Sequence, residues 1–119
     1  MDAEITTIGY GGKKPKEFFA ELESYNPDFV VDVRENPFKA FLGVYTKKGL
    51  EAKLGAKYRW IRELGNLTRD LPPTLVDEEE GLKKLGNLMR GRRHIILLCA
   101  EKDENKCHRG YIKAKIQQV

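Results

Sequence analysis

The sequence lacks any apolar run that approaches the ~20 residues of a transmembrane helix, so we expect no membrane-spanning protein. It also lacks internal repeats, low-complexity segments and any linker of domain-boundary composition. We therefore predict a single domain over residues 1–119, which is long enough to bury roughly two thirds of its unfolded surface. The first residues, Met-Asp-Ala-Glu, are acidic where a secretory signal is basic and then apolar, and this predicts a cytoplasmic protein.

Cysteine and histidine are scarce, with two of each in the chain. In the cytoplasm two cysteines are ordinarily free thiols, so we expect no permanent disulfide. A structural zinc site takes four ligands, whereas Cys99, Cys107 and His108 offer three, and an adjacent Cys-His pair rarely reaches one ion. We therefore predict neither a metal site nor a cofactor.

Charge of both signs is abundant: 22 basic and 18 acidic side chains give a net charge of +4. An excess this small describes a mixed, solvated surface better than the concentrated basic patch of a nucleic-acid-binding protein. The expected partner is a small anionic ligand, with nucleic acid as the weaker alternative and no membrane contact. Nothing in the sequence indicates an oligomeric state.

Four short segments rich in β-branched and other apolar residues predict strands near 4–9, 29–33, 58–61 and 94–99. Helical patterns separate them. Pro15 and Thr46 are suited to helix starts, as is Asp77 before an acidic first turn, and the stretch after 107 has a broad apolar face. Strands that alternate with helices predict an α/β fold: a mainly parallel sheet of about four strands with helices on both faces.

Residues 94–110 hold both cysteines and one histidine. The run 94–99 reads as a strand buried on both faces that ends in Cys99, and a polar loop follows in which Asp103 or Asn105 can cap the next helix. In parallel sheets, ligands bind beside the loops at the carboxyl ends of the strands. A helix N-terminus there favours an anion and lowers a thiol pKa. We predict that the catalytic residues are Cys99, Cys107 and His108, with Glu101 and Arg109 binding the substrate.

Asp32 interrupts an otherwise apolar strand, so its carboxylate needs a buried partner, and Arg34 two residues later points to the same side. The pair is either structural or part of a pocket with Cys99. The turn from Gly9 and Tyr10 to Gly12 is either a binding loop or only a tight turn, and the irregular segment 35–45 is either a lid or packed on the sheet.

With these motifs in place, the chain resembles the DUF488 family almost end to end. The resemblance is carried by residues 7–9, 31–34, 37–38, 63–65, 98–101 and 107–109. It implies a three-layer Rossmann-like or flavodoxin-like fold, and a cytosolic protein whose cysteines have been suggested to be redox-active. One departure is the turn Gly9-Tyr10-Gly11, where many relatives resemble Gly-His-Ser.

A weaker resemblance, through Val31 to Arg34, is to rhodanese-like domains, but the long acidic loop after Cys99 differs from their compact anion cradle. Sulfur transfer is therefore only an analogy. Two function classes stay open: thiol-based redox or small-anion chemistry, and a non-catalytic binding module for a phosphate-containing ligand or nucleic acid. Both predict a single site at the carboxyl edge of the sheet. We expect the following residues to surround it: Asp32, Arg34, Cys99, Glu101, Cys107, His108 and Arg109.

Overall fold

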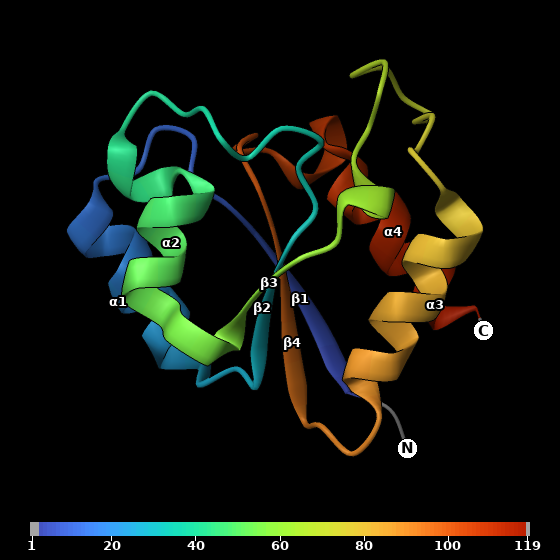
Figure 1. The fold of residues 1–119 in the computed structure, drawn as a ribbon, viewed down its shortest axis with the longest axis horizontal. Helices are drawn as coiled ribbons and strands as arrows, with labels where there is room; N and C mark the ends of the chain where they lie inside the picture. The colour runs from blue at the N-terminus through green and yellow to red at the C-terminus, as the bar shows by residue number, and fades with distance from the viewer. Residues whose placement is uncertain (1–2, 119) are drawn as a thin grey trace.

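The computed structural model of the protein describes residues 3–118, which form a four-stranded sheet in which all strands are parallel. The strand order is β1-β4-β2-β3 (Figure 1). The strands are β1 (Glu4–Gly9), β2 (Phe29–Asp32), β3 (Tyr58–Trp60) and β4 (His94–Cys99). The predicted strands are confirmed, and those at 29–33 and 58–61 end one residue earlier than expected.

Helices cover both faces of the sheet and complete a three-layer α/β fold (Figure 1). The helices are α1 (Pro15–Tyr25), α2 (Lys47–Leu54), α3 (Glu78–Met89) and α4 (His108–Gln117). Within residues 3–118, no helix has the length and apolarity needed to cross a membrane.

The predicted helix starts are confirmed: α1 begins at Pro15, Thr46 Oγ1 accepts from the Gly49 N–H, and Asp77 Oδ1 accepts from the Glu80 N–H. The last helix begins differently from the prediction. Cys107 is its N-cap residue, whereas Asp103 accepts from the Asn105 N–H and caps only a short turn, η4 (Glu104–Lys106). Cys107 and His108, which were both predicted to be catalytic, therefore lie at the start of α4.

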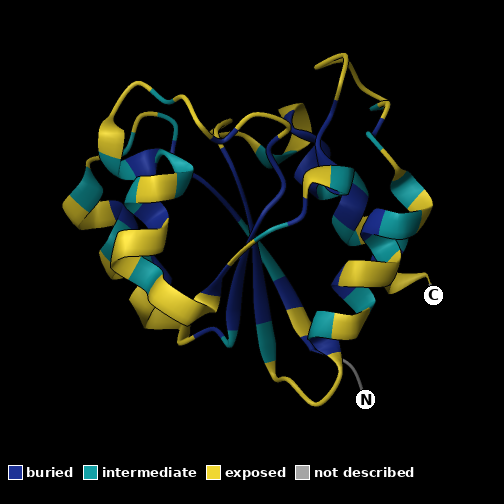
Figure 2. Ribbon diagram, viewed as in Figure 1, coloured by how far each residue is buried: buried dark blue, intermediate teal, exposed yellow. Residues whose placement is uncertain are grey.

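The sheet is buried from both sides, as Figure 2 shows. Because side chains alternate along a strand, Val31 and Leu97 belong to the core beneath α3 and α4, and Val30 and Ile96 to the core beneath α1 and α2. This double burial explains the continuous apolar runs of β2 and β4.

The order of the strands creates a crevice at the carboxyl edge of the sheet. Strand β4 lies between β1 and β2, with Gly9 beside Cys99 and Asp32 beside Leu98. The chain leaves β1 and β2 toward α1 and α2 on one face, but it leaves β4 toward α4 on the other (Figure 1). Such a divergence of neighbouring loops is where open α/β sheets bind ligands.

Candidate active site

A pocket of about 670 Å³ opens at this carboxyl edge, a volume in the range of small-molecule sites. All four strand-end loops contribute to it. Its lining consists of Tyr10, Gly11, Gly12, Arg34, Glu35, Asn36, Lys39, Asn66, Arg69, residues 99–102, Lys106, Cys107 and His108. The site is therefore shared by segments far apart in the sequence.

The two cysteines and His108 form one cluster in the wall of the pocket. Cys99 ends β4, Cys107 caps α4, and His108 is the first residue of that helix. One ligand atom from each of the three lies within 4.8 Å of the other two. Cys99 is 8% exposed and Cys107 is 6% exposed, so a reactant reaches the sulfurs only through the pocket.

The surroundings of Cys99 favour its thiolate. A hydrogen bond from Cys107, the backbone N–H groups of Glu101 and Ala100, and the positive charge of Arg109 together outweigh the effect of burial. They lower the pKa of Cys99 to about 7, below the value of about 8.5 for a free thiol.

The neighbouring Cys107 is held as the thiol. Its hydrogen bond to Cys99 raises the pKa of Cys107, burial raises it further, and His108 opposes the change. The pair therefore shares one proton near neutral pH, and because the N–H groups point at Cys99, the negative charge resides on that sulfur.

His108 is oriented to exchange a proton with Cys107. Its Nε2 lies 2.6 Å from the carbonyl oxygen of Val33 and donates to it, because a carbonyl can only accept. In the neutral ring this leaves the lone pair of Nδ1 free, and Nδ1 lies 3.6 Å from Cys107 Sγ. The Cys107 thiol, which carries one proton, can therefore donate it either to His108 or to Cys99.

Arg109 does not face the ligand pocket as the sequence analysis expected. Arg109 is 2% exposed, and its guanidinium donates from Nη1 to the Glu101 carbonyl at 2.6 Å and from Nη2 to the Lys102 carbonyl at 3.1 Å. The buried Nε has no hydrogen-bond partner among residues 3–118, and no carboxylate there forms an ion pair with this side chain. Arg109 is consequently a buried cation beneath the loop 101–102 whose charge favours a thiolate at Cys99.

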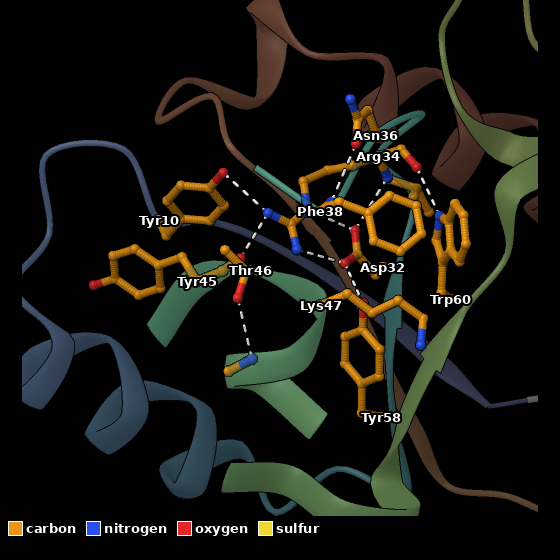
Figure 3. A network of polar contacts seen from close by, with 12 residues as sticks. Tyr10, Asp32, Arg34, Asn36, Phe38, Tyr45, Thr46, Lys47, Tyr58 and Trp60 are labelled. Carbon is orange, nitrogen blue, oxygen red and sulfur yellow. Dashed lines mark hydrogen bonds and ion pairs between the residues drawn. The ribbon is translucent and has the colours of Figure 1, made fainter. Parts of the chain in front are cut away.

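Asp32 and Arg34 form a second polar centre, and Figure 3 shows its contacts. Arg34 donates from Nε to Asp32 Oδ1 at 2.8 Å and from Nη2 to Oδ2 at 2.6 Å, and its Nη1 donates to the Tyr10 hydroxyl and the Tyr45 carbonyl. The Tyr58 hydroxyl donates to the same carboxylate. Burial and the charge of Asp32 raise the pKa of Tyr58, so it stays a donor.

The sequence allowed the Asp32–Arg34 pair to be either structural or part of the pocket, and the pair is partly each. Arg34 reaches the pocket wall, but Asp32 is fully buried behind it and cannot touch a ligand there. The predicted buried partner of Asp32 is therefore Arg34, and Asp32 accepts hydrogen bonds from two of the five N–H groups of the Arg34 guanidinium.

The glycine turn packs against the loop that follows Cys99. Tyr10 N–H donates to the Cys99 carbonyl and Gly11 N–H to the Ala100 carbonyl, at 3.2 and 2.8 Å. A Cβ atom at Gly9 would overlap the Glu101 carbonyl, so Gly9 permits a close approach and does not line the pocket. Tyr10, by contrast, lines it.

The pocket thus gathers Tyr10, Arg34, Cys99, Glu101, Cys107 and His108 from the predicted set, while Gly9, Asp32 and Arg109 lie behind its wall. Four cations in the lining were not predicted from the sequence: Lys39, Arg69, Lys102 and Lys106. Two of these lie between the cysteines, a position that could have drawn attention to them. Arg69 has a φ of 63°, in the left-handed region that non-glycine residues rarely adopt outside constrained sites.

Cys99, Cys107 and His108 are also the only group among residues 3–118 whose side chains could together hold a metal ion. The adjacent Cys107 and His108 do converge, contrary to the expectation from the sequence. They still supply three ligands where a structural zinc site takes four. No metal site is therefore assigned to the cluster.

A family model described as "Domain of unknown function DUF488" matches residues 14–75 and 73–116. No curated protein matches the chain, and no solved structure does. The Rossmann-like or flavodoxin-like detail of the fold therefore stays a prediction beside the observed parallel α/β sheet.

Proposed function

Because the chain belongs to the DUF488 family, whose description assigns no function, we propose one from the geometry of the site: thiol–disulfide exchange by the Cys99–Cys107 pair. The observation that carries the proposal is the placement of two thiols of opposite proton affinity side by side in the wall of one pocket. A thiolate is the attacking species in such exchange, and a nearby second thiol completes it.

In the first step the Cys99 thiolate attacks one sulfur of a disulfide in the pocket. A bond forms between Cys99 Sγ and that sulfur, the disulfide bond of the substrate breaks, and its other half leaves as a thiolate. A thiol pKa near 7 suits this step, because most of Cys99 is then ionised at pH above about 7 while its sulfur stays nucleophilic.

In the second step Cys107 attacks Cys99 Sγ and releases the second half of the substrate. Once Cys99 is in a mixed disulfide it no longer carries the negative charge that keeps Cys107 protonated. The Cys107 proton can pass to His108 Nδ1, 3.6 Å away, and from there to a leaving thiolate. Two electrons pass from the cysteines to the substrate, the two thiol protons end on its two halves, and a Cys99–Cys107 disulfide remains.

The test is incubation of the reduced protein with bis(hydroxyethyl) disulfide in the presence of a chelator, followed by peptide mass mapping. We expect an intramolecular disulfide between Cys99 and Cys107 in the wild type. Cys107→Ser should stop at a mixed disulfide on Cys99, and Cys99→Ser should modify Cys107 more slowly than the wild type modifies Cys99, because burial still raises the pKa of the Cys107 thiol when Cys99 is absent. Both serine variants should keep most of the stability of the wild type, since each replaces a thiol at a pocket wall.

The proposal would be contradicted if neither thiol reacted with the disulfide until the chain was denatured, and if both serine variants unfolded easily. The cysteines would then be packing residues. Unreactive thiols beside a tightly bound phosphate would instead favour the non-catalytic binding module.

A further inference from the structure

The pocket that contains Cys99 has a positive rim. Four cations line it, Lys39, Arg69, Lys102 and Lys106, against the two carboxylates of Glu35 and Glu101. None of these four forms an ion pair with a carboxylate among residues 3–118. Arg34 adds nothing to this excess, since Asp32 neutralises it.

The cations and the sulfur lie at different depths. Lys39, Arg69, Lys102 and Lys106 are exposed at the pocket mouth, whereas the side chain of Cys99 is buried in its wall. A substrate that presents a sulfur to Cys99 therefore places its other groups among uncompensated positive charges. The lining has more positive than negative side chains even when Cys99 carries its negative charge. The substrate's anionic groups can neutralise the remaining positive charge.

The depth of the sulfurs also limits the size of the substrate. Both cysteines are less than one tenth exposed, so a disulfide on the flat surface of a folded protein cannot reach them. A compound that fits within about 670 Å³ can enter the pocket whole.

We propose, resting on the exchange function above, that the substrate is a low-molecular-weight disulfide whose two halves carry carboxylates or similar anionic groups. The cationic rim binds those groups and aims the disulfide at Cys99. The positive rim also raises the local concentration of the anionic compound. An anionic disulfide is therefore preferred through a faster first step of the exchange.

The experiment compares three small disulfides of similar size: dithiodiglycolate, which is dianionic, bis(hydroxyethyl) disulfide, which is neutral, and cystamine, which is dicationic. The rate of Cys99 modification is measured by acid quench and mass spectrometry, and each rate is divided by that of N-acetylcysteinamide, a neutral free thiol. At low ionic strength we expect the dianion to be preferred over the neutral compound by on the order of ten-fold and the dication to be slowest. The preference should shrink toward one at about 1 M salt.

Matched variants locate the source of the preference. Lys102→Gln with Lys106→Gln should reduce the preference for the dianion over the neutral disulfide several-fold. Lys57→Gln with Lys83→Gln removes the same charge at exposed positions that do not line the pocket, and should leave the preference intact.

Equal normalised rates for the three compounds at low salt would overturn the inference, as would an equal loss of preference in the control variant. If the neutral disulfide still produced the Cys99–Cys107 disulfide, thiol exchange would stand and only the substrate class would be wrong. If no compound reacted before denaturation, the exchange function itself would fail.

Discussion

Two buried arginines lie on opposite sides of the sheet, and they differ in the groups that surround their positive charge. Arg34 lies on the side of α1 and α2, where the carboxylate of Asp32 accepts two of its hydrogen bonds. Arg109 lies in α4 on the other side, where its guanidinium donates only to backbone carbonyls and its charge lowers the pKa of Cys99. The first charge has a permanent partner, and the second has one only when Cys99 ionises.

The two arginines therefore have different roles: Arg34 stabilises the fold, whereas Arg109 affects the ionisation of Cys99. A permanently paired ion fixes the end of β2 and the pocket wall, but leaves little field for a reaction. An arginine without a carboxylate biases a neighbouring thiol toward its charged form, because a buried cation is costly until a counter-charge appears.

Asp32→Asn should cause the largest loss of stability, about 3–5 kcal/mol, because it leaves the Arg34 charge buried without its partner. The measurement is the free energy of unfolding in urea. The control is Glu63→Gln, which breaks the surface pair with Lys84 and should cost less than about 1 kcal/mol. Equal losses in both variants would show that the buried pair is no more important than a solvated one.

Tyr58→Phe removes one hydrogen bond to the Asp32 carboxylate and leaves Arg34 in place. Hydrogen bonds to charged groups contribute about 1.5–3 kcal/mol, so we expect a loss in that range in the same urea experiment. A loss equal to that of Asp32→Asn would mean that the hydroxyl, and not the ion pair, holds this centre together.

The stability of the reduced protein should depend on pH through the cysteine pair. Cys99 has a folded pKa of about 7 against about 8.5 unfolded, so between these values the unfolded chain binds one proton more and stability rises with pH, by about 2 kcal/mol. Above about 8.5 the raised pKa of Cys107 reverses the sign, because the folded chain then keeps a proton that the unfolded chain has lost.

This pH dependence is measured as the difference in unfolding free energy between the wild type and the Cys99→Ser, Cys107→Ser double variant, in a buffer with a reductant. We expect a maximum near pH 8.5 in that difference. A flat difference across the range would mean that neither thiol has a shifted pKa.

Arg109→Met should have the smallest effect on stability, below about 1 kcal/mol at about pH 5, where both thiols are protonated. The variant loses two hydrogen bonds to loop carbonyls, and it removes the cost of burying an unpaired charge, which offsets that loss. A loss as large as that of Asp32→Asn would show that Arg109 is as structural as Arg34.

Much of the fold could be predicted because β4 and β2 are continuous apolar runs and the helix starts have recognisable residues such as Pro15, Thr46 and Asp77. The meeting of Cys99 with Cys107 and His108 followed from topology alone, since α4 begins at the end of the strand that carries Cys99. These features depend on local pattern and on the general geometry of parallel sheets.

The orientation of Arg109 could not be predicted in the same way. It depends on which residue caps α4: with Cys107 as the cap, Arg109 turns under the loop 101–102 and not into the pocket. Similarly, Asn66 and Arg69 come to the pocket from an irregular segment after β3 that has no periodic pattern. Loop paths of this kind are set by tertiary contacts and not by local sequence.

The most direct test is a titration of the thiolate absorbance of the reduced protein with both cysteines present, where Cys99 is the first thiol to ionise, with and without Arg109→Met. We expect Cys99 to ionise below the free-thiol pKa of about 8.5 in the presence of Arg109, and the pKa to rise when the guanidinium is removed, while a Lys57→Met control leaves it unchanged. A Cys99 pKa at or above about 8.5 in both proteins, or one that Arg109→Met does not move, would contradict a contribution of the Arg109 charge to the lowered pKa of this thiol.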